Sequence, residues 1–213
     1  MEAEFWHERW EKNEIAFHQS EGNPLMVKYF DRLGLPEDAR VFVPLCGKTG
    51  DIGWLLSNGF RVVGAELNEM AIEHLFQDLG VEPDITEEAP FRRYSAHGID
   101  ILVGDFFELP ADRLGAVDAV YDRAALVALP DDMRRRYAGH LMTVTGTAPQ
   151  LLITYVYDQS LLPGPPFSVS DAQVEQYYSD RYELTRLEGV EIEGGLKGKC
   201  AAVETVWLLR QAV

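Results

Sequence analysis

Cysteine is nearly absent from this chain. Among 213 residues there are two, Cys46 and Cys200, which are too few for a disulfide framework or for a zinc site built from cysteines. No apolar run approaches the length of a transmembrane helix, and the first residues, MEAEFWHERWEKNE, are charged too often for a secretory signal. We therefore expect a cytoplasmic protein.

Positive charge is also scarce. The chain has 19 Lys and Arg residues against 35 Asp and Glu residues, which gives a formal net charge of -16 and a pI near 4.6. A surface of this charge repels nucleic acid and anionic lipid unless it carries a strong basic patch. The one basic cluster, Arg134-Arg135-Arg136, lies in a helical pattern and is interpreted as a solvated helix face. We predict a small-molecule partner, with no nucleic acid and no membrane.

Apolar residues are plentiful, at 46% of the chain, and we predict one domain over residues 1–213. From residue 40 onward apolar strands alternate with helical patterns, which is typical of a parallel sheet covered by helices on both faces. Residues 82–98 are polar and contain proline, so we expect a long surface insertion there. The predicted strands are residues 41–45, 61–66, 99–103, 117–122 and 151–157, with two later extended segments that end at 206–209 and form an antiparallel edge.

Two helix boundaries are marked by local signals. Asn23 is a good N-cap, and Pro24 suits the first helical position because its missing N–H is not needed there. This helix precedes the first strand and belongs to an N-terminal appendage. A later helix, with apolar residues at helical spacing from Ile72 to Leu79, is expected to end at Gly80.

The segment VFVPLCGKTGD, which begins at Val41, resembles two kinds of ligand-binding turn. A phosphate loop needs a glycine where this chain has Phe42, inside the strand, so that loop is excluded. A dinucleotide-type turn is matched at Gly47 and Gly50, with Leu45 in place of its first glycine. Glu66 ends the next strand, about 20 residues on, where an acidic side chain binds a ribose. A solvated strand end is the alternative for Glu66, but the combination indicates a ligand that carries adenosine.

Asp51 helps to choose between adenosine ligands. It opens the helix after the turn, where the positive end of the helix dipole would favour a pyrophosphate. A carboxylate there disfavours a nicotinamide dinucleotide and suits the cationic S-adenosylmethionine, although an ordinary N-cap is an alternative role. The balance favours methyl transfer. DNA amino-methyltransferases are excluded, because Gly164 in the GPPF segment lacks the side chain that their signature uses and the net charge opposes DNA.

Several segments of the chain, taken together, resemble those of one protein family. They are VFVPLCGKTGDIGWLLSNGFRVVGAEL, GDFFELP, DAVYDRAALVALP and PGPPFSV, with WHERWEKNEIAFHQSEGNP ahead of them. Together they resemble the thiopurine S-methyltransferase family, and specifically its bacterial members, which are associated with methylation of selenium and tellurium compounds. The resemblance extends from Trp6 to Val169, and it is specific because PLCGK replaces the usual glycine-rich turn in an uncommon way.

The resemblance implies a fold, a cofactor and a set of contacts. The fold is α/β, a class I methyltransferase (Rossmann-like) seven-stranded sheet with helices on both faces, an antiparallel seventh strand and an N-terminal helical lid over residues 1–36. The implied protein is a monomeric enzyme that uses S-adenosyl-L-methionine. The family's cofactor contacts fall here on Trp10, Leu45, Glu66 and Arg123, with Trp6, Asp105 and Phe106 close by.

The residues themselves indicate matching roles. Leu45 and Gly47 would present backbone groups to the cofactor, and Glu66 would bind the ribose hydroxyls. Asp105 and Phe106 would border the adenine.

Structural roles are the alternatives for three of these residues. Trp6 and Trp10 would form the buried face of a helix. Arg123 would pair with Asp122 or Asp105.

The acceptor side of the site is predicted at Phe17, a substrate-facing position by resemblance, and again at Arg123. Thiopurines and selenols ionise near or below neutral pH, so a general base is optional and no catalytic residue is assigned. His18 is the one candidate base, with a solvated loop histidine as the alternative. Vertebrate members have a second arginine before the last strand, where this chain offers only Lys197 and Lys199, and this difference favours a smaller acceptor.

The pattern is also compatible with other functions. A halide or thiocyanate methyltransferase, a nicotinamide-dependent oxidoreductase and a non-catalytic sensor of an adenosine ligand each fit part of the pattern. The five histidines show no metal-binding spacing, and no metal is expected.

Overall fold

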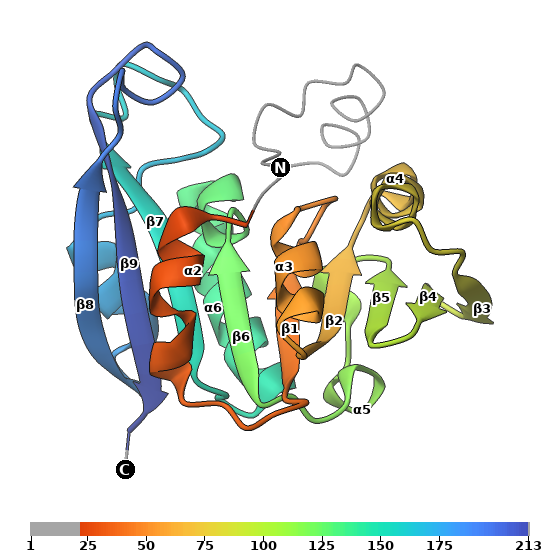
Figure 1. Ribbon diagram of the computed structural model, residues 1–213. Coiled ribbons are helices and arrows are strands. Elements are labelled where there is room, and N and C mark those ends of the chain that lie inside the picture. The colour runs from red at the N-terminus through yellow and green to blue at the C-terminus, as the bar shows by residue number, and fades with distance from the viewer. Residues whose placement is uncertain (1–21, 213) are drawn as a thin grey trace.

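A mixed sheet of nine strands, in the order β3-β4-β5-β2-β1-β6-β7-β9-β8, forms the centre of the molecule (Figure 1). The computed structural model describes residues 22–212. The strands are β1 (Arg40–Pro44), β2 (Arg61–Glu66), β3 (Asp84–Glu88), β4 (Phe91–Ala96), β5 (Ile99–Val103), β6 (Ala119–Arg123), β7 (Gln150–Tyr157), β8 (Tyr182–Glu191) and β9 (Ala202–Gln211).

Five central strands run parallel to one another. β1 pairs in parallel with β2 and β6, β2 with β5, and β6 with β7. The last strand, β9, is antiparallel to both β7 and β8. Strands β1 and β2 are almost continuously buried, as expected for a sheet covered on both faces. The predicted α/β arrangement is therefore confirmed, including its antiparallel edge.

Helices cover both faces of this sheet. In Figure 1, α2 and α3 lie on the viewer's side and α6 lies behind. Residues of α4 share the apolar core of α2 and α3, and residues of α5 and α7 share the core of α6. The helices are α2 (Pro24–Tyr29), α3 (Asp51–Ser57), α4 (Glu69–Leu79), α5 (Ala111–Leu114), α6 (Asp131–Thr145) and α7 (Asp171–Tyr178), with short 3-10 turns η1 (Phe30–Leu33), η2 (Phe106–Glu108) and η3 (Leu126–Ala128).

The two predicted helix boundaries are confirmed. The Asn23 side chain caps α2 by accepting hydrogen bonds from the backbone N–H groups of Leu25 and Met26, and Pro24 occupies the first turn. Helix α4 ends at Gly80, which has a left-handed φ of 68°. Both signals act through local backbone geometry, which is why they can be read from the sequence.

Residues 82–98 differ from the prediction of a surface insertion. They form the hairpin β3–β4, which adds two antiparallel strands beside β5 and extends the expected seven strands to nine. Two rings of β4 anchor it, because Phe91 and Tyr94 are each only 2% exposed and pack into the cores on opposite faces of the sheet. The outer strand β3 is mostly exposed and carries several acidic side chains, which protect an open sheet edge against pairing.

The arginine triplet also differs from its prediction. Arg135 and Arg136 are exposed, but Arg134 is 2% exposed and donates from Nε to the carbonyl of Leu129 at 2.8 Å. It also donates to the carbonyl of Ser168 at 3.2 Å. Arg134 thus joins α6 to two loops, and only the other two arginines form a solvated face.

The predicted lid falls partly outside the described residues. Trp6, Trp10, Phe17 and His18 lie there, so their predicted roles stay predictions. Within residues 22–36, α2 and η1 pack against the sheet through the apolar core. Between residues 22 and 212, no helix has the length and apolar character needed to cross a membrane.

Candidate active site

Four neighbouring strands, β5, β2, β1 and β6, end at the same edge of the sheet. Ligands of open α/β sheets bind at this carboxyl edge. Every predicted site residue in the described part of the chain follows one of these strands or ends it. These residues are Leu45 and Gly47 after β1, Glu66 at the end of β2, Asp105 and Phe106 after β5, and Arg123 at the end of β6.

The turn after β1 has an unusual backbone. Leu45 has a φ of 45° and Gly47 a φ of 50°. Glycine adopts this left-handed conformation without strain. For another residue, such as Leu45, the conformation costs about 1–2 kcal/mol of stability. Strain of this kind concentrates at ligand sites. Lys48, next in the chain, forms an ion pair with Asp78 at 3.2 Å.

Glu66 joins the turns that follow β1 and β2. Its side chain is 7% exposed, and Oε2 accepts a hydrogen bond from the Gly47 N–H at 2.8 Å. Oε1 accepts from the Asn68 N–H at 2.9 Å. Each carboxylate oxygen can accept a second hydrogen bond. A carboxylate fixed at this strand end fits the hydroxyls of a ribose.

Asp51 differs from both roles considered for it. Gly50 occupies the N-cap of α3, and the Asp51 side chain is 1% exposed. Its Oδ1 accepts from the Asn23 N–H at 2.7 Å, and its Oδ2 accepts from the Tyr121 hydroxyl at 2.9 Å. The carboxylate is therefore neither a cap nor a ligand-facing group. It fastens the start of α2 to α3 and to β6.

The segment after β5 presents its two predicted residues differently. Asp105 is exposed, and its Oδ1 accepts from the Phe107 N–H at 2.8 Å, which caps η2. The Phe106 ring is 2% exposed and stacks on Phe42 with 6.2 Å between ring centroids. Phe106 therefore offers a ligand its backbone rather than its ring, and the predicted contact with adenine stays a prediction.

The end of β6 separates Asp122 from Arg123. Asp122 is fully buried, where its Oδ1 accepts from the Leu126 N–H at 3.1 Å and its Oδ2 from the Tyr137 hydroxyl at 2.7 Å. Burial raises the pKa of Asp122 to about 6. Successive residues of a strand point to opposite faces, so Asp122 is not the ion-pair partner considered for Arg123. Ala124 follows with a φ of 71°, a second strained position at this edge that no sequence signal marks.

Arg123 lies among oxygen-bearing groups. Burial by itself would lower the pKa of its guanidinium. Tyr155, Tyr121, Asp51 and Glu204 more than offset that effect, and the pKa lies above its ordinary value. Tyr155 and Glu204 are missed by sequence reasoning, because they lie on β7 and β9 and meet only through the antiparallel pairing of those strands.

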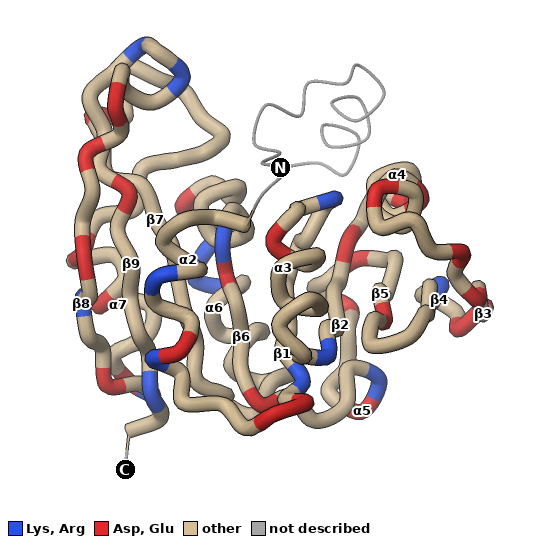
Figure 2. The backbone as a smooth tube through the Cα atoms, in the orientation of Figure 1, with Lys and Arg blue, Asp and Glu red and all other residues tan. Residues whose placement is uncertain are grey.

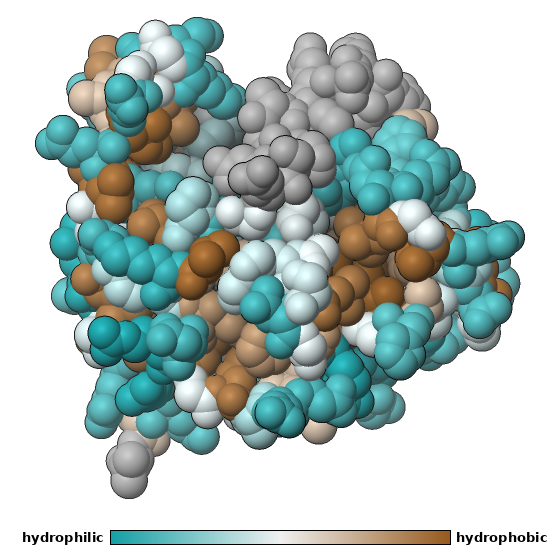
Figure 3. All heavy atoms as spheres, viewed as in Figure 1, coloured by the Kyte–Doolittle hydropathy of each residue, from teal (hydrophilic) through white to brown (hydrophobic). Residues whose placement is uncertain are grey.

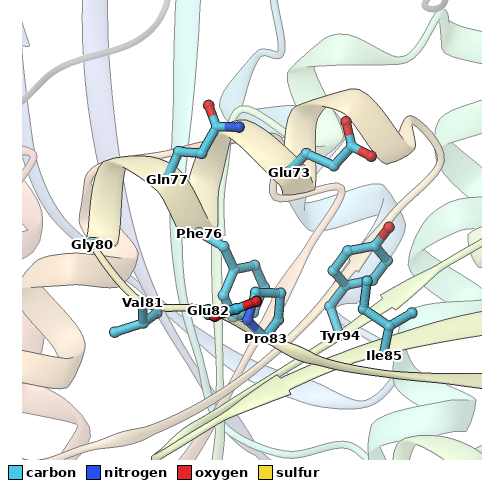
Figure 4. Close-up of a pocket in the computed structure, with 9 residues that line it drawn as sticks. All are labelled: Glu73, Phe76, Gln77, Gly80, Val81, Glu82, Pro83, Ile85 and Tyr94. Carbon is cyan, nitrogen blue, oxygen red and sulfur yellow. The ribbon is translucent and has the colours of Figure 1, made fainter.

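A separate open pocket of about 630 Å³ lies between the second half of α4 and the β3–β4 hairpin (Figure 4). No predicted site residue lines it. Val81 and Ile85 are 44% and 54% exposed there, and Figure 3 shows apolar atoms gathered below α4. The lining residues are Glu73, Phe76, Gln77, Gly80, Val81, Glu82, Pro83, Ile85 and Tyr94.

Acidic residues surround the carboxyl edge. Figure 2 shows them at the start of α3, at the end of β2 and on α4. Over residues 22–212, no group of three or more His, Cys, Asp or Glu side chains is placed to hold a metal ion. Near the end of β2 these charges suit a cationic ligand, whereas Arg123 at the end of β6 suits an anionic one.

Comparison with known proteins decides the family. The family model described as thiopurine S-methyltransferase matches residues 1–210. This chain belongs to that family. A thiopurine S-methyltransferase of Xanthobacter autotrophicus is 55% identical over 213 residues, with 100% of both chains covered. One of Gluconobacter oxydans is 50% identical, over 96% of this chain and 93% of the relative.

Solved structures share the fold at low sequence identity. A TehB-like SAM-dependent methyltransferase from Corynebacterium glutamicum has a TM-score of 0.57 at 16% identity and covers 98% of each chain. The 1,6-didemethyltoxoflavin-N1-methyltransferase of Burkholderia thailandensis, with bound S-adenosylhomocysteine, has a TM-score of 0.65 at 13% identity and covers 98% of this chain and 87% of that one. These likenesses confirm the class I methyltransferase fold.

As a member of the thiopurine S-methyltransferase family, the chain is a methyltransferase that depends on S-adenosyl-L-methionine. The residues at the carboxyl edge fit this cofactor. Two backbone N–H groups hold the Glu66 carboxylate, and the left-handed turn at Leu45 and Gly47 lies beside it. When bound, S-adenosylmethionine supplies a methyl group activated by a positively charged sulfur.

Proposed function

We propose that this enzyme transfers a methyl group from S-adenosylmethionine to the sulfur of thiopurines or related thiols, and that small selenium and tellurium compounds are further acceptors. One observation carries the proposal: Glu66, held by two backbone N–H groups, lies at the same sheet edge as Arg123. Strand β1 runs between the strands that carry these two residues. The first position suits a cofactor ribose, and the second suits an acceptor. The proposed enzyme is monomeric and cytoplasmic.

The residue roles divide between cofactor and acceptor. On the cofactor side, Glu66 binds the ribose hydroxyls and Leu45 and Gly47 present backbone groups. Asp105 borders the adenine through its side chain, and Phe106 does so through its backbone.

Three residues outside the described part of the chain complete the proposal. Trp6 and Trp10 contact the cofactor, with face contacts that favour its cationic centre. Phe17 faces the acceptor, together with Arg123, which also contacts the cofactor.

The protein's contribution to the reaction is alignment. A soft nucleophile displaces a sulfide from an activated methyl carbon in line, so the protein mainly holds the two reactants at the correct angle and excludes water. Thiopurines and selenols lose their proton to solvent near neutral pH, before the carbon–chalcogen bond forms. The Arg123 guanidinium then stabilises the remaining negative charge of the acceptor, and no side chain has to remove a proton.

A panel of acceptors with labelled S-adenosylmethionine tests this function. The panel contains 6-mercaptopurine, thiophenol, selenite, tellurite, iodide and thiocyanate. We expect transfer to the thiopurine and the thiol. Transfer to iodide or thiocyanate alone would replace the proposal with a halide methyltransferase, and cofactor binding without transfer to any acceptor would indicate a sensor.

The variant Glu66→Gln links the panel to the site. Its amide nitrogen cannot accept a hydrogen bond from a backbone N–H or from a ribose hydroxyl. We therefore expect the KM for S-adenosylmethionine to rise by about tenfold or more. Glu82→Gln is the control, because Glu82 is exposed and lies on the α4–β3 connection. Equal cofactor KM values in both variants would remove Glu66 from the site.

A further inference from the structure

Tyr155 and Glu204 lie on the same face of the sheet as Arg123. They are direct partners in the antiparallel register of β7 and β9, and the Tyr155 hydroxyl donates to Glu204 Oε1 at 3.2 Å. Arg123 pairs with Ile153, two residues before Tyr155, so its side chain points to the same face. The Tyr155 hydroxyl interacts with both the guanidinium and the carboxylate.

A second carboxylate, that of Asp51, also acts on Arg123. Asp51 is held by the Asn23 N–H at 2.7 Å and by the Tyr121 hydroxyl at 2.9 Å. Tyr121 lies two residues before Arg123 on β6 and faces the same way. The Asn23 side chain donates from Nδ2 to Glu204 Oε1 at 3.2 Å and so joins the two carboxylates into one network.

The charges of this network do not balance. Within residues 22–212 this network sets one guanidinium against two carboxylates, so the formal charge of these groups is negative, on a chain whose net charge is -16. A single negative charge on an acceptor can contact the guanidinium directly. A second charge on the same acceptor has no such partner among these groups and is repelled by the carboxylates.

We propose that Glu204 is a specificity-determining residue, which makes the acceptor site select singly charged chalcogen anions, such as thiolates, over acceptors that carry an additional negative charge. Tyr155 transmits the effect by holding the carboxylate beside Arg123. The inference rests on the proposed function and narrows its substrate class. Thiols that carry a second anionic group are thereby poor acceptors.

Two acceptors that share an aromatic thiolate and differ by one carboxylate group test the inference. Thiophenol presents a thiolate on a ring, and para-mercaptobenzoate presents the same thiolate with an added carboxylate. For the parent chain we expect a higher kcat/KM with thiophenol. In Glu204→Gln the kcat/KM for the carboxylated thiol, relative to that for thiophenol, should rise about fivefold. The change should arise in the acceptor KM and not in kcat, with the KM for S-adenosylmethionine unchanged.

Glu188→Gln is the matched control. Glu188 is also a strand glutamate that accepts from a tyrosine, since Tyr29 donates its hydroxyl at 3.0 Å. It lies on β8, three strands away from Arg123, and is already paired with Lys28 at 2.8 Å. We expect the ratio of the two acceptors in this variant to equal that of the parent.

Glu204→Asp separates charge from structure. It keeps the carboxylate and shortens the side chain, so the parent ratio should persist even if overall activity falls. A ratio in Glu204→Gln equal to that of the parent overturns the inference, and so does a shift in Glu204→Asp as large as that in Glu204→Gln. Methylation of thiophenol by the parent tests the proposed function by itself, and transfer to neither acceptor overturns both.

Discussion

Single residues of β6 divide their work between the two faces of the sheet. Arg123 points into the polar network with Glu204, while Asp122 is buried on the opposite face. The Asp122 carboxylate accepts hydrogen bonds from the Leu126 N–H and the Tyr137 hydroxyl. It therefore holds the turn that carries Arg123 and the strained Ala124. A buried carboxylate in this position makes the stability of the site depend on pH.

The sign of that dependence follows from the pKa of Asp122. Burial raises it from 3.8 to about 6, so the folded state binds the proton more tightly than the unfolded state. The stabilisation is fully present below the unfolded pKa and is lost as pH rises through the folded one. As the pH rises from 3.8 through about 6, ionisation of Asp122 should lower the free energy of unfolding by about 3 kcal/mol.

Asp122→Asn should remove this loss. The amide keeps an oxygen for the Leu126 N–H and cannot ionise, so the stability of the variant relative to the parent should improve between pH 4 and pH 6. Urea unfolding at a series of pH values measures the difference. Tyr137→Phe is a second check, because loss of its hydrogen bond should move the fall to higher pH. Parallel pH profiles of parent and Asp122→Asn would contradict the assignment.

At the scale of elements, β2 controls how closely the sheet packs beneath the cofactor turn. A Cβ on Gly64 would lie 2.6 Å from Ile101 Cδ1 and 2.9 Å from Cys46 Sγ. Cys46 precedes Gly47, whose N–H holds Glu66. The absence of a side chain at one strand position thus allows the turn after β1 to approach the end of β2.

Gly64→Ala should destabilise the protein by about 1–3 kcal/mol, because the added methyl group overpacks a full core. It should also weaken binding of S-adenosylhomocysteine by displacing the turn. Gly53→Ala is the matched control. Gly53 lies in helix α3, and the added Cβ would meet Leu79 Cδ2 at an ordinary contact distance of 3.6 Å. Alanine is the better helix former, so this variant should be more stable than the parent by about 0.5–1 kcal/mol. Urea unfolding and a binding titration compare the two. Equal stability of both variants would contradict the packing argument.

For the whole molecule, cofactor binding and folding are linked. Within residues 22–212, the proposed cofactor contacts come from the end of β2 and from the turns after β1 and β5. These turns hold their geometry only in the folded chain. A ligand that binds the folded state alone stabilises it by mass action.

S-adenosylhomocysteine should therefore raise the melting temperature. At about 100 times its Kd the gain is about 2.7 kcal/mol, which for a chain of this size corresponds to about 5–10 °C. Thermal unfolding with and without the ligand measures it, with NADH at the same concentration as the control. An equal shift with NADH would contradict the assigned cofactor site.

Sequence reasoning succeeded where local signals act. The bounds of β2, the cap at Asn23 and the end of α4 at Gly80 were predictable, because an apolar run, a capping side chain and a left-handed glycine each act within a few residues. The placement of Leu45, Glu66 and Arg123 at one edge was predictable as well, since the ends of parallel strands meet.

It failed where distant segments meet. The β3–β4 hairpin looked like a polar loop because only Phe91 and Tyr94 bury their rings deeply. Arg134 looked solvated until two loops supplied carbonyl partners. The sequence suggested a cap or a ligand contact for Asp51. In the structure its carboxylate oxygens accept hydrogen bonds from the Asn23 N–H at the start of α2 and from the Tyr121 hydroxyl on β6.

By itself the sequence determined that this is an α/β methyltransferase of the thiopurine S-methyltransferase family, with Glu66 and Arg123 at the carboxyl edge of its sheet. Only the tertiary structure decided that Arg123 is surrounded by Tyr155, Glu204 and Asp51. Periodicity and turn motifs are properties of neighbouring residues, and a single chain shows them. The charge around a side chain is instead set by antiparallel register and helix docking, which bring together residues far apart in the sequence.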